Sequence, residues 1–126
     1  RQFFYDRYVS ALRKEVLLGG FMSALGEAHK LAVYGAGKVG REALSALCLY
    51  DKRPDCFAVS DISNNEPCVE GVPVRGVDEL LPEQENYVII IATAMGMQPE
   101  ILELLLEKGF TNIVSFLPEV RQALRA

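Results

Sequence analysis

Histidine and tryptophan are almost missing from this sequence of 126 residues, and its three cysteines are widely spaced. His29 is the only histidine, so we expect neither a Ser-His-Asp triad nor a histidine-rich metal site within the chain. Cys48, Cys56 and Cys68 form no Cys-x-x-Cys pair, which disfavours a zinc or redox site and agrees with a reducing compartment. The sequence therefore predicts no catalytic residues and no metal ligands of its own.

Basic segments and long apolar runs are also missing. The net charge is −4, and no basic patch is interleaved with aromatic residues, so we expect no nucleic-acid partner. No apolar run reaches the roughly 18 residues of a membrane-spanning helix, and no targeting segment is recognisable, so we expect a cytoplasmic protein. The length suits one domain. Because the sequence begins with Arg1 rather than Met, we expect a piece of a longer protein.

The glycine-rich segment 35–40 is the clearest functional signal in the sequence. An apolar run, 31–34, precedes it and apolar residues at helical spacing follow it, as in the strand–turn–helix unit that binds dinucleotides. In the G-x-G-x-x-G pattern the first glycine permits a tight turn, the second lets backbone approach a pyrophosphate, and the third allows close helix–strand packing. The helix N-terminus offers free N–H groups to an anion. The predicted phosphate-binding residues are Gly35, Ala36, Gly37, Lys38, Val39 and Gly40.

An acidic residue stands where this fingerprint requires one. Asp61 ends a second predicted strand, 56–61, and lies 21 positions after Gly40, close to the spacing of the carboxylate that binds ribose. With Ser60 it is a candidate contact to the ligand. A carboxylate would repel a 2′-phosphate, which favours NAD or a UDP-sugar over NADP. The alternative is that Asp61 only caps a turn with its neighbours Asn64 and Asn65.

Strand and helix patterns alternate from Lys30 onward, which predicts an α/β fold with a three-layer, Rossmann-like parallel sheet. About five strands are expected, in the order 3-2-1-4-5, and Pro73 in the third strand favours an edge position. Residues 62–71 are predicted to form a polar loop and 78–81 a helical turn. The predicted strands are 30–34, 56–61, 71–74, 87–93 and 113–116, and the predicted helices are 38–50, 99–108 and one that starts at 118.

Residues 1–29 precede this nucleotide-binding domain, 30–126, as a helical extension. Apolar residues recur at helical spacing over 2–18, Gly19-Gly20 is expected to break the helix, and 21–27 is expected to form a second short helix. The extension is unusually rich in aromatic residues. These aromatic residues are Phe3, Phe4, Tyr5 and Tyr8. We expect them to pack on their own domain, on a neighbouring domain or on a second copy.

The predicted ligand site lies outside the carboxyl ends of the strands, where the strand order reverses between strands one and four. The loop after the fourth strand would place Thr93 and Ala94 against the phosphates or the sugar. Met95 would cover a base or a sugar as adaptable apolar surface, or would simply fill the loop. At the start of the first helix, Lys38 is expected to contact phosphate and Arg41 to face solvent.

Five blocks of sequence resemble a known family: KLAVYGAGKVG, FAVSD, GVPVRGVDELL, YVIIIAT and LLEKGFTNIV, within 30–117. Their order is similar to that in the small Rossmann-like domain of bacterial polysaccharide- and glycan-biosynthesis proteins. Such domains accompany nucleotide-sugar dehydratases and epimerases, sugar acetyltransferases, glycosyltransferases and sugar methyltransferases. In the acetyltransferase members this domain holds a UDP-sugar, so the resemblance implies that Gly35, Gly37 and Gly40 lie near its phosphates and Asp61 near the uridine. The acetyltransferase members usually carry a histidine in this loop, where this chain has Lys38-Val39, which disfavours that branch.

We therefore predict a nucleotide-binding module, for an NDP-sugar or NAD, that belongs to a larger glycan-biosynthesis enzyme and is not catalytic alone. Its partners would be the nucleotide or nucleotide-sugar, other domains of a longer chain and, through the N-terminal helix, a second copy. An alternative is a scaffold or regulatory domain with a vestigial nucleotide pocket. Weaker alternatives are a fragment of an NAD-dependent oxidoreductase and a pocket for S-adenosylmethionine.

Overall fold

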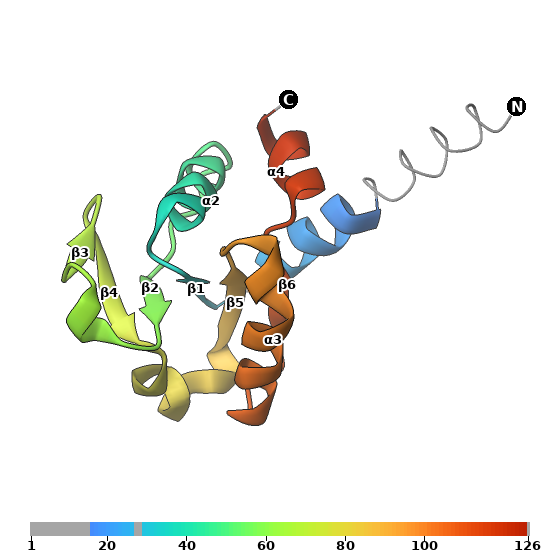
Figure 1. Ribbon diagram of the computed structural model, residues 1–126. Coiled ribbons are helices and arrows are strands. Elements are labelled where there is room, and N and C mark those ends of the chain that lie inside the picture. The colour runs from blue at the N-terminus through green and yellow to red at the C-terminus, as the bar shows by residue number, and fades with distance from the viewer. Residues whose placement is uncertain (1–15, 27–28, 126) are drawn as a thin grey trace, which may run out of the picture.

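A six-stranded sheet forms the centre of the protein (Figure 1), in a computed structural model that describes residues 16–26 and 29–125. Its order is β3-β4-β2-β1-β5-β6. The strands are β1 Lys30–Tyr34, β2 Cys56–Val59, β3 Cys68–Val69, β4 Val72–Gly76, β5 Tyr87–Ile91 and β6 Ile113–Ser115. All neighbours pair in parallel except β3 and β4. The predicted α/β fold and the predicted order of the five parallel strands are confirmed.

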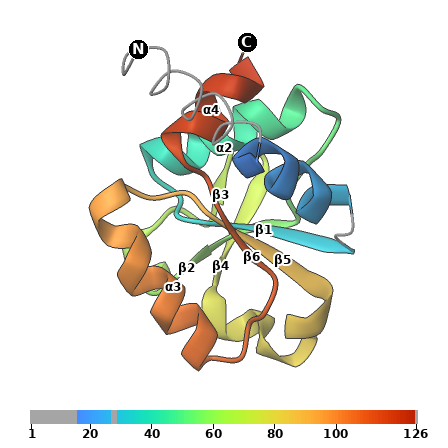
Figure 2. The ribbon, with the colours of Figure 1, turned by 90° about the vertical axis from the view of Figure 1, so that its right-hand side faces the viewer.

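Helices cover both faces of the sheet, as the apolar strands require. Every residue of β5 is buried, which agrees with a central parallel strand that packs on both faces. Figure 2 shows α2, α4 and the helix at 16–26 on one face, and α3 with η2 on the other. The helical elements are α2 Lys38–Cys48, η1 Ile62–Asn64, η2 Val77–Asn86, η3 Met95–Met97, α3 Gln98–Glu107 and α4 Pro118–Arg125.

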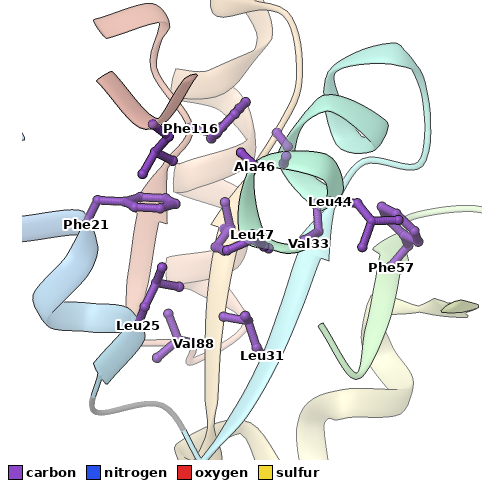
Figure 3. Packing of buried hydrophobic residues seen from close by; sticks show 14 of the residues in the cluster. Phe21, Leu25, Leu31, Val33, Leu44, Ala46, Leu47, Phe57, Val88 and Phe116 are labelled. Atoms are coloured by element: carbon purple, nitrogen blue, oxygen red, sulfur yellow. The ribbon is translucent and has the colours of Figure 1, made fainter. Parts of the chain in front are cut away.

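Two apolar cores result, one on each face of the sheet. In the first, Phe21 and Leu25 of the N-terminal helix pack with Leu47 of α2 and Phe116 (Figure 3). The ring centroids of Phe21 and Phe116 lie 6.2 Å apart. The second core is built around β5, η2 and α3, with Leu105 fully buried. The extension that precedes the nucleotide fingerprint is therefore part of the domain's own core over 16–26.

The predicted loop at 62–71 is wrong at two places, because it contains η1 and β3. Glu70 and Gly71 both have positive φ, 51° and 83°, which makes a two-residue hairpin between β3 and β4. Such a turn matches the twist of the flanking strands. The predicted third strand, now β4, is consequently not at the edge. Its Pro73 lies opposite Cys68 of the short outer strand β3.

The predicted break at Gly19-Gly20 is also wrong, because one helix runs continuously over 16–26. Glycine costs about 1 kcal/mol per residue in a helix interior relative to alanine. Burial of Phe21 and Leu25, each only 3% exposed, offsets that cost. Of the predicted helix 2–18, residues 16–18 are helical, whereas residues 2–15 with their four aromatic residues lie outside the described residues. No helix within 16–26 or 29–125 combines the length and the apolar character that a membrane crossing requires.

Candidate nucleotide site

The strand register brings the predicted site residues to one edge of the sheet. Tyr34, the last residue of β1, pairs with Ala58 of β2 and Ile91 of β5. The Gly35 N–H donates to the Ala58 carbonyl at 3.0 Å, which holds the glycine turn against β2. Both β2 and β5 end two residues before their predicted ends, so Ser60 and Asp61 directly follow β2, and Thr93 follows Ala92 after β5. The carboxyl ends of β1, β2 and β5 therefore meet where the sequence places the ligand.

Two glycines of the fingerprint are required by the fold itself. Gly35 has φ +112°, and a Cβ there would lie 2.6 Å from the carbonyl oxygen of Ala92. A Cβ on Gly40 would lie 1.9 Å from the carbonyl oxygen of Gly35, so α2 can approach the turn only because Gly40 has no side chain. These distances explain the first and third glycines by close packing between β1, β5 and α2.

Gly37 is different, because nothing in the described protein fills the space beside it. A Cβ built there would meet no heavy atom within 4 Å, and its φ of −91° is open to any residue. Gly37 is the N-cap of α2, where no side chain accepts a hydrogen bond from the first turn and no acidic residue is present. The first-turn N–H groups thus have no side-chain cap, and the positive end of the helix dipole lies beside the exposed Gly37, as at helix N-termini that bind anions.

A hollow of about 580 Å³ begins at this turn and runs along α2. It is lined by Gly37, Lys38, Arg41, Glu42 and Ser45. Within the described part of the chain, neither the Lys38 ammonium nor the Arg41 guanidinium is hydrogen-bonded or ion-paired. The Glu42 carboxylate is held at 2.5 Å by Arg121 of α4. The pairing neutralises Glu42, so two free cations dominate the charge of the hollow.

Ala36 and Val39 face the other way. Both are partly buried and pack against the apolar core under α2. They shape the turn rather than line the hollow. Of the six predicted phosphate-binding residues, only Gly37 and Lys38 line it directly.

Asp61 is used by its own turn. It is the N-cap of η1, and its Oδ1 accepts from the Ser63 N–H at 3.0 Å and from the Ser63 hydroxyl at 2.6 Å. Its Oδ2 accepts from the Asn64 amide at 2.8 Å. The hydrogen bond from the Ser63 hydroxyl and that from its N–H lower the pKa of the exposed carboxyl. Since a carboxylate has about four acceptor positions, one remains for a ligand.

Ser60 is tied to the central strand. Its hydroxyl is hydrogen-bonded to the phenol of Tyr34, which is buried at the end of β1. The bond joins the ends of β1 and β2 beneath the glycine turn. Ser60 therefore supports the edge of the site and keeps its exposed position there.

The loop after β5 is anchored by a residue that the sequence reasoning did not single out. Gln98 is 6% exposed, and its Nε2 donates to the Thr93 carbonyl at 3.1 Å. The methyl group of Thr93 lies beside Gly35, so the loop and the glycine turn are in contact. Ala94 and Met95 are exposed beyond this contact.

Sequence reasoning also missed Glu42 and Ser45. Lys38, Arg41, Glu42 and Ser45 recur at helical spacing, so this polar stripe was a readable signal. The Arg121 partner was not, because 79 positions separate it from Glu42. Among the described side chains, no group of three or more His, Cys, Asp or Glu residues is placed to hold a metal ion.

No protein-family model and no curated protein matches the chain. Among solved structures it is similar to the acetyltransferase domain of PglB from Neisseria gonorrhoeae FA1090 in complex with acetyl coenzyme A. The identity is 27% and the TM-score 0.51, over 66% of this chain and 41% of that one. A second structure of that domain matches at 27% identity and TM-score 0.49, over 64% and 40% of the two chains. The chain thus spans about two fifths of the structures it matches.

Proposed function

We propose that this chain is a nucleotide-binding module of a larger glycan-biosynthesis enzyme and that it holds the diphosphate of its ligand at the glycine turn. Gly37 carries the proposal. The fold accounts for Gly35 and Gly40 by close packing, but it places nothing within 4 Å of a Cβ at Gly37. The missing side chain therefore matches a need to admit a ligand beside the free N–H groups of α2.

The charges beside the turn support a ligand with phosphate groups. Lys38 and Arg41 are exposed and have no acidic partner in the regions the structure describes, while Glu42 is neutralised by Arg121. Hydrogen bonds from such cations to phosphate are among the stronger ones that proteins make. Arg41, expected from the sequence to face solvent, lines the hollow with Lys38 and becomes a second candidate phosphate contact.

A nucleoside diphosphate sugar is the ligand class we favour over NAD. The sequence blocks resemble a domain that holds a UDP-sugar in its acetyltransferase members, and the similarity to an acetyltransferase domain favours the branch that the missing loop histidine had disfavoured. Asp61, with one acceptor position left on its carboxylate, would bind a ribose or uridine group and would repel the 2′-phosphate of NADP. Chemistry on the sugar would fall to other parts of a longer chain, because His29 precedes β1 and lies at the opposite edge of the sheet from the glycine turn.

Thermal-shift measurements with a panel of ligands test this proposal. The panel contains UDP, several UDP-sugars, NAD, NADP, coenzyme A and S-adenosylmethionine. We expect UDP-sugars to raise Tm and the Lys38→Ala/Arg41→Ala variant to lose most of that rise. Lys52→Ala, which removes an exposed lysine outside the hollow, is the matched control and should respond as the natural protein does. A larger rise with NAD would replace the sugar ligand, and no rise with any nucleotide would contradict the proposal.

A second candidate is a scaffold domain with a vestigial pocket. The observation in its favour is that three hydrogen bonds from Ser63 and Asn64 already occupy Asp61. In that case the turn, and not a ribose, is the reason for the acid at this position. A natural chain that is folded but shows no rise in Tm with any nucleotide of the panel would favour this second candidate.

A further inference from the structure

The outer face of α3 is apolar although it is open to solvent. Pro99, Leu102 and Leu106 form a row at helical spacing, which we call the α3 ridge, and the two leucines are 39% and 54% exposed. The opposite side of the same helix is already used, because Ile101 and Leu105 are buried against the sheet. A helix that is apolar on both sides is typical of a helix covered on both sides.

Carboxylates border this ridge. A hollow of about 500 Å³ lies along it, lined by Pro99, Leu102, Glu103, Leu106 and Glu107. Within 16–26 and 29–125, neither Glu103 nor Glu107 takes part in an ion pair or a side-chain hydrogen bond. The surface therefore fits an apolar segment that also carries positive charge. Two α3 ridges could not face each other, because their carboxylates would be brought together.

The first fifteen residues of this chain have that chemistry. Their sequence carries four basic residues, Arg1, Arg7, Arg13 and Lys14, against two acidic ones, Asp6 and Glu15, for a net charge of +2. Their apolar residues include Phe4, Tyr8, Ala11 and Leu12, which recur at the i, i+4, i+7 and i+8 positions of a helical face. An amphipathic helix that lays such a face into a groove is a recurrent mode of peptide recognition.

The position at which residues 1–15 join the fold indicates whether they contact the α3 ridge of the same copy or that of a second copy. Residues 16–26 pack in the core on the α2 and α4 face of the sheet, while α3 packs on the opposite face. Figure 2 shows the two helices on opposite faces of the sheet. We propose that residues 1–15 of each copy dock on the α3 ridge of a second copy, which gives a two-fold symmetric dimer with two equivalent contacts.

Sedimentation velocity of the full chain over a range of concentrations tests this proposal. We expect a dimer, and we expect the Leu102→Ser/Leu106→Ser variant to be a monomer at concentrations where the natural chain is dimeric. Leu49→Ser/Tyr50→Ser is the matched control, since it removes two exposed apolar side chains, 68% and 43% exposed, just after α2. Far-UV circular dichroism checks that each variant is folded.

Charge reversal identifies the occupant of the ridge. Glu103→Lys/Glu107→Lys should weaken the dimer at least about tenfold, because like charges would then face each other across the interface. Arg7→Glu/Arg13→Glu should weaken it similarly, and the two pairs combined should restore it. A monomeric natural chain, or a dimer that tolerates serine in the ridge, would overturn the proposal. So would a dimer that needs the ridge but tolerates the arginine reversal, because another segment would then occupy it.

Discussion

Replacement of Gly40 by alanine tests whether close packing of α2 on the glycine turn requires a glycine at this position. The added Cβ would lie 1.9 Å from the Gly35 carbonyl oxygen and 2.8 Å from its carbonyl carbon. An ordinary carbon–oxygen contact is about 3.3 Å or longer, so α2 must move away from β1 by roughly 1.4 Å. Because the obstacle is backbone, no side-chain rotation relieves it.

The magnitude follows from two opposing terms. Overpacking a well-filled site costs typically about 1–3 kcal/mol, and backbone contact places this site at the upper end. Alanine in a helix contributes about 1 kcal/mol relative to glycine. We therefore expect the Gly40→Ala variant to lose about 2 kcal/mol of unfolding free energy.

Urea unfolding followed by circular dichroism measures this loss. Gly37→Ala is the matched control in the same turn, because its Cβ would meet no heavy atom within 4 Å. The control should change the unfolding free energy by no more than about 1 kcal/mol, the usual size of an N-cap effect. A Gly40→Ala variant as stable as the Gly37→Ala variant would refute the claim that close helix–strand packing dictates the third glycine.

Two further predictions concern pH and thiol reactivity. The pKa of Asp61 is lowered by Ser63, so the η1 cap stabilises the fold above the ordinary carboxyl pKa of 3.8 and is lost as the pH falls through the lower folded pKa. The Tm of Asp61→Asn should therefore fall less steeply than the Tm of the natural chain as the pH is lowered below 3.8. An identical dependence of Tm on pH in the two proteins would contradict this. Burial raises the pKa of the Cys56 thiol to about 11, whereas Cys48 and Cys68 are exposed. A thiol reagent at neutral pH should label two cysteines quickly in the folded protein and the third only on unfolding, whereas three fast thiols would contradict the burial.

The sequence predicted the fold well because its signals there are local and redundant. The apolar run of β5 and the glycine turn each identify a βαβ unit, and parallel connection then restricts the order of the strands. The glycine roles were also predictable, since Gly35 and Gly40 are required by close backbone approach. The strand–turn–helix elements and the packing roles of Gly35 and Gly40 both depend on sequence patterns that span only a few residues.

The errors arose where tertiary packing or turn geometry overrode local propensity. Gly19-Gly20 reads as a helix break, but Phe21 and Leu25 are buried in the core and hold the helix together. The hairpin of β3 and β4 depends on a positive φ at Glu70, a residue type that gives little turn signal.

The internal contacts of the candidate site could not be predicted from the sequence. The carboxyl ends of the strands meet as expected, yet the sequence could not show whether Asp61 is free or caps a turn. The structure shows the cap, formed with Ser63 and Asn64. The pairing of Glu42 with Arg121 is a long-range contact that no local spacing encodes.

Calorimetric titration of a UDP-sugar into the natural chain and into the Gly37→Val variant measures whether the glycine turn binds the diphosphate of the ligand. Gly19→Val is the control, because a Cβ there also meets no heavy atom within 4 Å and the position lies outside the candidate site. We expect saturable binding by the natural chain and the control, and at least a tenfold loss of affinity, about 1.4 kcal/mol, for Gly37→Val, whose unfolding free energy should fall by no more than the roughly 1 kcal/mol of an N-cap effect. Equal affinity in all three proteins, or no binding by the natural chain, would contradict it.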